Sequence, residues 1–122
     1  MTSRKSRHLI TSAILFILFF SFTTYAQAQE HTVSGKVTDE SGIPLEYATI
    51  SFQDPSDPQN LTGGITDANG AFAIEVEEGT YNIKVEFISF EPKTFPNRNI
   101  KEDLNMGTIV LGMAAANLNE VV

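Results

Sequence analysis

The sequence predicts an all-β fold, a sandwich of two small sheets that follows a cleavable signal peptide. Three observations predict it. Beyond Gln29, apolar and polar residues alternate with a period of two, as in strands that bury one face. Clusters of Gly, Pro, Asp and Asn separate the alternating runs. Finally, no long segment after Gln29 combines helical periodicity with helix caps.

The N-terminus has the order of a secretory signal peptide. Three basic residues, Arg4, Lys5 and Arg7, precede the 14-residue uncharged run 9–22. This run is shorter than the roughly 20 apolar residues of a transmembrane helix, so an uncleaved anchor is the less favoured alternative. A small-x-small pattern ends at Ala26 and Ala28. We therefore expect residues 1–28 to be removed and Gln29 to become the first residue.

Composition limits the function classes. The chain has 122 residues, 8 basic and 15 acidic, with a net charge of −7 and no cysteine. Signal cleavage would leave five basic residues and all 15 acidic ones, a net charge of −10. Such a domain is not suited to bind nucleic acid or to insert directly into a membrane. Without cysteine, disulfides and thiolate sites are excluded.

The alternating runs place the strands. They cover 33–37, 48–52, 72–76 and 81–87, with a shorter run at 109–111. The segment 61–66 is a weaker candidate, because two glycines interrupt it. The phase of these runs predicts an inward set for the core: Val33, Val37, Ala48, Ile50, Phe52, Phe72, Ile74, Tyr81, Ile83, Val85, Phe87, Ile109 and Leu111.

Turn residues punctuate the runs. The segments 39–42 and 67–70 each end in a glycine, where a tight turn needs positive φ. We expect hairpins at Asn69-Gly70 and at Glu78-Gly79. The segment 54–58 contains two prolines and is predicted to be a loop tip, and Pro92 and Pro96 predict an irregular stretch.

No catalytic, cofactor-binding or metal-binding residues are predicted. His8 would leave with the signal peptide, and His31 lies near the mature N-terminus without placed partners. The segment beginning at Asp67 starts like a calcium loop, but a hydrophobic strand follows at once where further ligands would be needed. A plain turn accounts for it, so we expect a protein that is not an enzyme.

Two blocks of residues carry a family resemblance. VSGKVTDESGIPLEYATISF and GGITDANGAFAIEVEEGTYNIKVEFISF resemble the carboxypeptidase regulatory-like domain family. The resemblance implies a seven-stranded, transthyretin (prealbumin)-like β-sandwich over residues 29–112, used as an ancillary module without zinc ligands. The matching positions include Gly35, Asp39, Gly42, Pro44, Asp67, Gly70, Phe72, Gly79 and Tyr81.

The last residues resemble a more particular setting. The segment NMGTIVLGMAAANLNEVV is similar to the stretch that leaves this domain in TonB-dependent outer-membrane receptors. The resemblance implies that 113–122 is a linker towards a plug and β-barrel, and that this chain is a fragment or truncated form of such a receptor. It also implies an exported protein, located in the periplasm or associated with the outer membrane.

The predicted function is therefore docking to a protein partner, such as a barrel, a plug or an energy-coupling component. Candidate contact residues are Tyr47, Ile88, Phe90 and Phe95. Ile88 and Phe90 are out of phase with the inward set; the alternative is that they pack beneath the 92–96 loop. A free-standing secreted or cell-surface module that binds a ligand such as a glycan is the second hypothesis.

Overall fold

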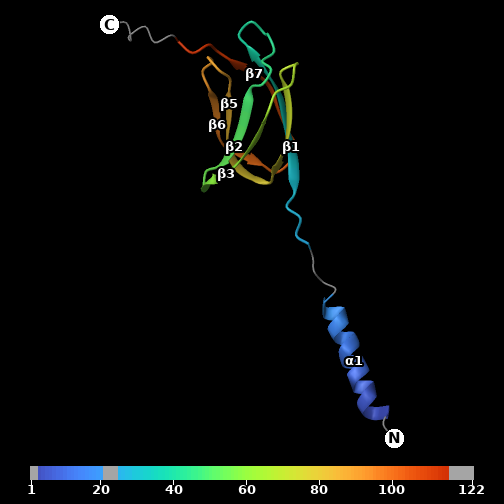
Figure 1. Ribbon diagram of the computed structural model, residues 1–122. Coiled ribbons are helices and arrows are strands. Elements are labelled where there is room, and N and C mark those ends of the chain that lie inside the picture. The colour runs from blue at the N-terminus through green and yellow to red at the C-terminus, as the bar shows by residue number, and fades with distance from the viewer. Residues whose placement is uncertain (1–2, 21–24, 116–122) are drawn as a thin grey trace.

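The computed structural model describes residues 3–20 and 25–115, which form one helix and a two-layered β-sandwich (Figure 1). The helix α1 is Ser3–Phe20. The strands are β1 (Glu30–Asp39), β2 (Thr49–Asp54), β3 (Asp57–Ile65), β4 (Ala71–Glu77), β5 (Gly79–Glu86), β6 (Lys93–Ile100) and β7 (Leu104–Leu111). The prediction of a mostly β sandwich is confirmed.

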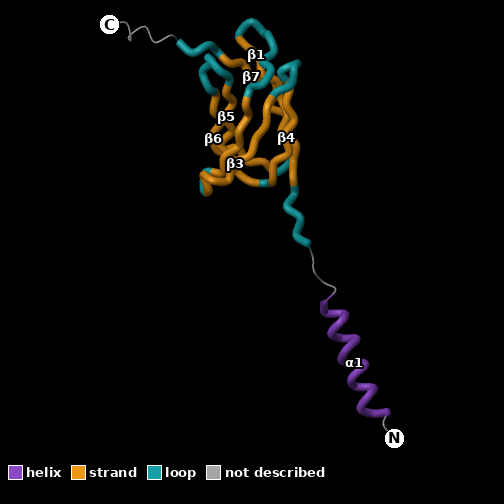
Figure 2. The backbone as a smooth tube through the Cα atoms, in the orientation of Figure 1, coloured by secondary structure: helices purple, strands orange, loops and turns teal. Residues whose placement is uncertain are grey.

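The sheets are β4-β1-β7 and β3-β2-β5-β6. All neighbours are antiparallel except β1 and β7, which are parallel. The loops gather at two ends of the strand-rich body (Figure 2). We call the end that holds 39–48, 66–70, 87–92 and 112–115 the upper end. The lower end holds the turns 54–57, 77–79 and 100–104.

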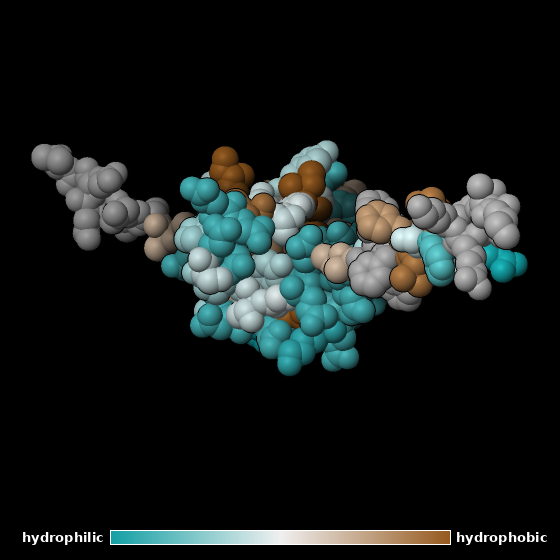
Figure 3. All heavy atoms as spheres, turned by 90° about the horizontal axis from the view of Figure 1, so that it is seen from below, coloured by the Kyte–Doolittle hydropathy of each residue, from teal (hydrophilic) through white to brown (hydrophobic). Residues whose placement is uncertain are grey.

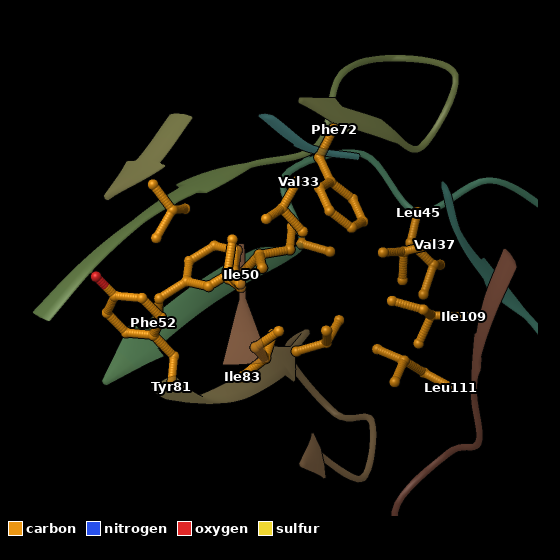
Figure 4. Packing of buried hydrophobic residues seen from close by; sticks show 14 residues of the cluster. Val33, Val37, Leu45, Ile50, Phe52, Phe72, Tyr81, Ile83, Ile109 and Leu111 are labelled. Atoms are coloured by element: carbon orange, nitrogen blue, oxygen red, sulfur yellow. The ribbon is translucent and has the colours of Figure 1, made fainter. Parts of the chain in front are cut away.

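The core lies between the two sheets, and its side chains point towards one another from both layers (Figure 4). Phe52 and Tyr81 meet edge to face, with ring centroids 6.3 Å apart. A Cβ on Gly35 would lie 2.7 Å from the Phe72 ring, so glycine at this position lets the ring pass beneath β1. The buried set is Val33, Val37, Leu45, Ala48, Ile50, Phe52, Phe72, Val76, Tyr81, Ile83, Val85, Ile100, Ile109 and Leu111.

Most of the predicted core is confirmed. Ile74 and Phe87 are exceptions, since both are only half-buried and pack against the core. Leu45, Val76 and Ile100 are buried although they were absent from the predicted set. Leu45 lies outside any strand, and Ile100 ends a strand that the sequence did not predict, so alternation gave no signal for either.

Both predicted hairpins are wrong. The turn at Gly70 joins β3 to β4, and the turn at Gly79 joins β4 to β5. Because β4 belongs to the other sheet, each turn carries the chain across the sandwich rather than between paired neighbours. In sequence, a hairpin within one sheet and a crossing between two sheets both appear as two alternating runs joined by a tight turn. Which of the two forms depends on which strands pair.

The prolines were also misinterpreted. The loop tip at 54–58 is confined to Pro55 and Ser56, and Pro58 lies within β3. The stretch around Pro96 is the strand β6 rather than irregular chain. Both β3 and β6 are edge strands, where a residue without an N–H can face away from the neighbouring strand.

Before the sandwich, the described residues form the helix α1 and an exposed stretch at 25–29. Within the described ranges, no helix is both long and apolar enough to cross a membrane. Ala26, Ala28 and Gln29 lie in exposed chain between α1 and β1. The Gln29 carbonyl already accepts a hydrogen bond from the Glu78 amide at 2.9 Å. The predicted cleavage point therefore lies where the sandwich begins.

Candidate docking surface

Tyr47 stands at the upper end on a tightly held backbone. Its φ of +66° is a left-handed backbone conformation that residues other than glycine seldom adopt. The residue is 67% exposed. The buried Thr66 fixes the segment around it. The Thr66 hydroxyl donates to the Leu45 carbonyl at 2.5 Å and accepts from the Ala48 amide at 2.9 Å. The Tyr47 amide donates to the Thr66 carbonyl at 3.2 Å.

Ile88 stands beside Tyr47, just after β5. It is 83% exposed, and the next residue, Ser89, has φ = +67°. Tyr47 and Ile88 flank an open groove that is also lined by Glu46, Thr49, Glu86 and Phe87. Thr49 and Glu86, which we call the groove floor, are paired across β2 and β5. The sheet therefore supplies part of the groove lining.

Ile65 extends this surface onto β3. It pairs with Thr49 and is 58% exposed, so it lies on the same outer face of the sheet as the groove floor. We call Tyr47, Ile65 and Ile88 the apolar patch. Ile65 was not among the predicted contact residues, because the two glycines before it weakened the strand assignment for 61–66.

The other two candidate contact residues lie elsewhere. Phe90 is half-buried and packs on Phe87, with ring centroids 5.4 Å apart. Its backbone forms an isolated bridge with Met113. Phe95, on β6, is half-buried against the core, and the Arg98 guanidinium lies 5.6 Å from its ring centroid. Of the four candidates, the structure brings together only Tyr47 and Ile88.

Two aspartate turns support the upper end. In each, the carboxylate accepts two backbone N–H bonds: Asp39 from Ser41 and Ile43, and Asp67 from Asn69 and Ala71, at 2.8–3.0 Å. The glycines that close them, Gly42 and Gly70, have the expected positive φ, +83° and +72°. Pro44 forms a bridge with Thr38. Both carboxylates thus serve their own turns.

The lower end is acidic. Asp54, Asp57, Glu77, Glu78, Glu102 and Asp103 lie in or beside its turns. The view from below shows mainly hydrophilic side chains over the sandwich (Figure 3).

Hydrogen bonds from the Ser56 hydroxyl and then the Ser56 amide lower the pKa of Asp54. Burial, and then the charge of Glu77, raises the pKa of Tyr81, whose hydroxyl donates to the Glu77 carbonyl.

The acidic side chains are dispersed. Across the described residues, no group of three His, Asp or Glu side chains is arranged to hold a metal ion. His31 contacts a single carboxylate, that of Glu78, at 3.4 Å. In chemical terms, the upper end offers apolar and aromatic contact area beside the Glu46 and Glu86 carboxylates, and the lower end offers negative charge.

Known proteins share both sequence and fold with this chain. The sequence profile of the carboxypeptidase regulatory-like domain matches residues 32–111. "Structural protein 27" of a virus (isolate Australia/Victoria) is 37% identical over 73 residues, which cover 60% of this chain and 13% of the viral protein. The chain therefore spans about an eighth of the length of this curated relative.

Two solved structures share the fold. One is a chain of a type II cohesin-X-dockerin complex from Acetivibrio cellulolyticus, with a TM-score of 0.55, 23% identity and coverage of 68% of this chain and 58% of that one. The other is the Bacillus anthracis TIE protein, with a TM-score of 0.51, 15% identity and coverage of 70% and 17%. At these identities the likeness concerns the fold alone.

Proposed function

The chain belongs to the carboxypeptidase regulatory-like domain family, and we propose that it is a non-enzymatic docking module for a protein partner. The observation that carries the proposal is the apolar patch. Tyr47, Ile65 and Ile88 are each more than half exposed, and two of them flank an open groove. Exposed apolar clusters on rigid elements are typical of protein interaction sites.

The rigidity of the patch supports the proposal. The left-handed backbone conformation costs a residue other than glycine about 1–2 kcal/mol of free energy, and Tyr47 adopts that conformation. The four hydrogen bonds that link Thr66 to Leu45, Tyr47 and Ala48 maintain it. A preorganised aromatic side chain loses little conformational entropy on binding. The fold thus holds Tyr47 in a position that favours contact with another surface.

The setting that we propose is export followed by attachment to a larger protein. The matching segments form 13% of the viral protein and 17% of the TIE chain, so similar segments occur as one part of longer chains. The residues 1–28 have the order of a signal peptide. The stretch 118–122, outside the described residues, resembles the exit from the same domain in TonB-dependent receptors. We propose that the module is the N-terminal extension of such a receptor in the periplasm.

Photo-crosslinking tests the docking surface. A benzophenone amino acid replaces Tyr47 in the exported protein, and replaces Val110 on β7 as a matched control on the other sheet. We expect position 47 to give one adduct of defined mass with an outer-membrane barrel, plug or energy-coupling protein. The adduct should be lost with Ile88→Ser, and position 110 should give none. Equal adducts from both positions would contradict the proposal.

A glycan is the competing ligand, because Tyr47 is an exposed aromatic side chain beside a groove. Binding of the exported protein to a glycan array distinguishes the two. Saturable binding of one glycan that is abolished by Tyr47→Ala, without a protein adduct, would replace the docking proposal with a ligand-binding one. We expect no glycan to compete with the adduct.

Mass spectrometry of the exported protein tests the proposed processing. We expect the mature N-terminus at Gln29 and loss of the three basic residues of the leader. An intact Met1–Ala28 segment in the membrane fraction would contradict this part of the proposal.

A further inference from the structure

The four sheet edges of this sandwich differ in how well they are closed to a further strand. Three of them carry interruptions or charge. β6 contains Pro96, Asn97 with φ = +52°, and the charged Lys93 and Arg98. On β7, the backbone turns to φ = +68° at Gly107, and the Lys93 ammonium donates to the Val110 carbonyl at 3.4 Å.

β4 is protected by charge, since Glu75 and Glu77 lie along it. Such features are those by which natural sheets prevent further pairing. β3 lacks them over 59–65, which has no charged residue, and its pairing with β2 is regular from Gln53–Leu61 to Thr49–Ile65. Among the described strands, β3 is thus the edge with the fewest such features, and these, Asp57 and Pro58, lie at its start.

The free backbone groups of β3 can be assigned. Just beyond the ladder, the Thr66 amide donates to the Ala48 carbonyl at 2.9 Å. Bonded pairs alternate in antiparallel sheets, so Gly64 and Thr62 also direct their N–H and C=O groups towards β2. Leu61, Gly63 and Ile65 therefore direct theirs away from the sheet.

The side chains on this edge suit an extended segment. Leu61 and Ile65 are 61% and 58% exposed on the outer face. Gly63, between them, has no side chain, and a Cβ there would collide with the Ile50 carbonyl. The result is a smooth edge with two apolar contacts, and Ile65 joins it to the apolar patch.

Charge around the edge specifies the chemistry of an occupant. Asp54 and Asp57 flank its lower end. Beside Asn60 and Thr62, a polar cleft is lined by Glu30, Glu75 and Glu77. Basic residues of the described sandwich lie elsewhere: Lys36 in β1, Lys84 paired with Glu86 at 2.7 Å, and Lys93, Arg98 and Lys101 on or after β6. A second copy of this acidic chain would be repelled, whereas a basic-flanked segment would be attracted.

We infer that β3 accepts an extended strand of the protein partner, apolar at alternate positions and flanked by Lys or Arg, which pairs with the free groups of Leu61, Gly63 and Ile65. This inference rests on the proposed docking function and names its mode, β-strand addition. The basic flank at the lower end of β3 faces Asp54, Asp57 and the β4 carboxylates, and the apolar side chains reach Leu61 and the patch.

Peptide binding to the exported, isotope-labelled protein tests the inference. The probe is a peptide of alternating threonine and valine with lysine pairs at both ends, and its binding is followed by NMR and calorimetry. We expect the largest amide shifts at Leu61, Gly63 and Ile65. N-methylation of alternate peptide amides should weaken binding about tenfold or more, because the backbone hydrogen bonds are lost. Glutamate in place of lysine should weaken it by a similar factor.

Variants of Leu61 separate backbone from side-chain effects. Leu61→Pro removes one free N–H without removing a bond to β2, and should abolish peptide binding while the melting temperature changes little. Leu61→Ala keeps the N–H and should weaken binding only about threefold. Equal binding by the N-methylated peptide, shifts centred on β6, absence of binding, or a dimer that Leu61→Pro dissociates would each overturn the inference.

The crosslinking experiment distinguishes the two proposals. If the Tyr47 adduct persists in Leu61→Pro, strand addition fails and the docking function stands. If the peptide binds β3 but position 47 yields no adduct, the apolar patch is not the docking surface.

Discussion

The two ends of the sandwich share one kind of turn but differ in what surrounds it. At both ends an aspartate carboxylate accepts a hydrogen bond from the amide two residues later in the chain: Asp39 and Asp67 at the upper end, Asp54 at the lower end. The Asp67 turn rests on the chain beneath it, where the Gly70 carbonyl accepts from the Val37 amide at 2.7 Å. The Asp54 turn extends into solvent. The same local pattern therefore supports a rigid surface at one end and a solvated tip at the other.

Substitution of the two upper-end glycines should give the largest contrast. A Cβ on Gly70 would collide with the Val37 carbonyl and approach Pro44 to 3.1 Å, whereas one on Gly42 would meet nothing within 4 Å. Both positions have positive φ, which costs alanine about 1 kcal/mol. We expect Gly70→Ala to lower the free energy of unfolding by about 3 kcal/mol and Gly42→Ala by about 1 kcal/mol. Equal losses in denaturant titrations would show that the surroundings do not matter.

Removal of the Thr66 hydroxyl should have the next largest effect. Thr66→Val keeps the shape but leaves the Leu45 carbonyl and the Ala48 amide without their partner in a buried site. We expect a loss of about 2 kcal/mol in the free energy of unfolding, with Tyr47 amide exchange accelerated. Thr66→Ser retains the hydroxyl and should cost less than half as much. If the valine variant is as stable as the serine variant, the hydrogen bonds of the Thr66 hydroxyl do not hold the upper end.

Tyr81 provides a milder test at the lower end. Tyr81→Phe removes the hydrogen bond to the Glu77 carbonyl, 3.0 Å long, and should cost about 1 kcal/mol at neutral pH. Burial raises the pKa of Tyr81, so the folded state retains this proton more tightly than the unfolded state. Its contribution is complete below pH about 10 and is lost as the pH rises through the folded pKa. The difference between the two proteins, measured by thermal melts, should therefore shrink above pH about 10.

The exposed Asp54 turn should give the smallest effect. Ser56→Ala removes the hydroxyl that donates to Asp54 at 2.6 Å. We expect no resolvable change in melting temperature at neutral pH, and a rise in the Asp54 pKa towards its ordinary value in an NMR titration. A lowered pKa stabilises the fold above the unfolded pKa, and this contribution disappears as the pH falls through the folded pKa. Any difference between the proteins should therefore vanish in acid.

Much of the fold could be predicted from particular residues. The alternation at 48–52 and 81–87 correctly placed Ile50, Phe52, Ile83 and Val85 in the core, because an alternating strand must bury one face. Asp39 with Gly42, and Asp67 with Gly70, correctly marked tight turns, because side-chain capping and positive φ are local properties.

The candidate site was predicted only in part. Tyr47 and Ile88 were singled out as exposed and do meet at one groove, but Phe90 and Phe95 pack against the body of the sandwich. Ile65 was missed because glycines obscured its strand. The phase of an alternating run indicates which way a side chain points, whereas the neighbours on that face depend on strand pairing.

The alternation of residues, the positions of the turns and the acidic charge of the domain all follow from the amino-acid sequence. The choice of neighbouring strands was made only in the folded molecule. It made the turns at Gly70 and Gly79 crossings between sheets, it placed Pro58 and Pro96 on edges, and it left β3 open beside acidic side chains. The physical reason is that turn chemistry and burial phase act within a few residues, whereas pairing is fixed by contacts between segments far apart in the chain.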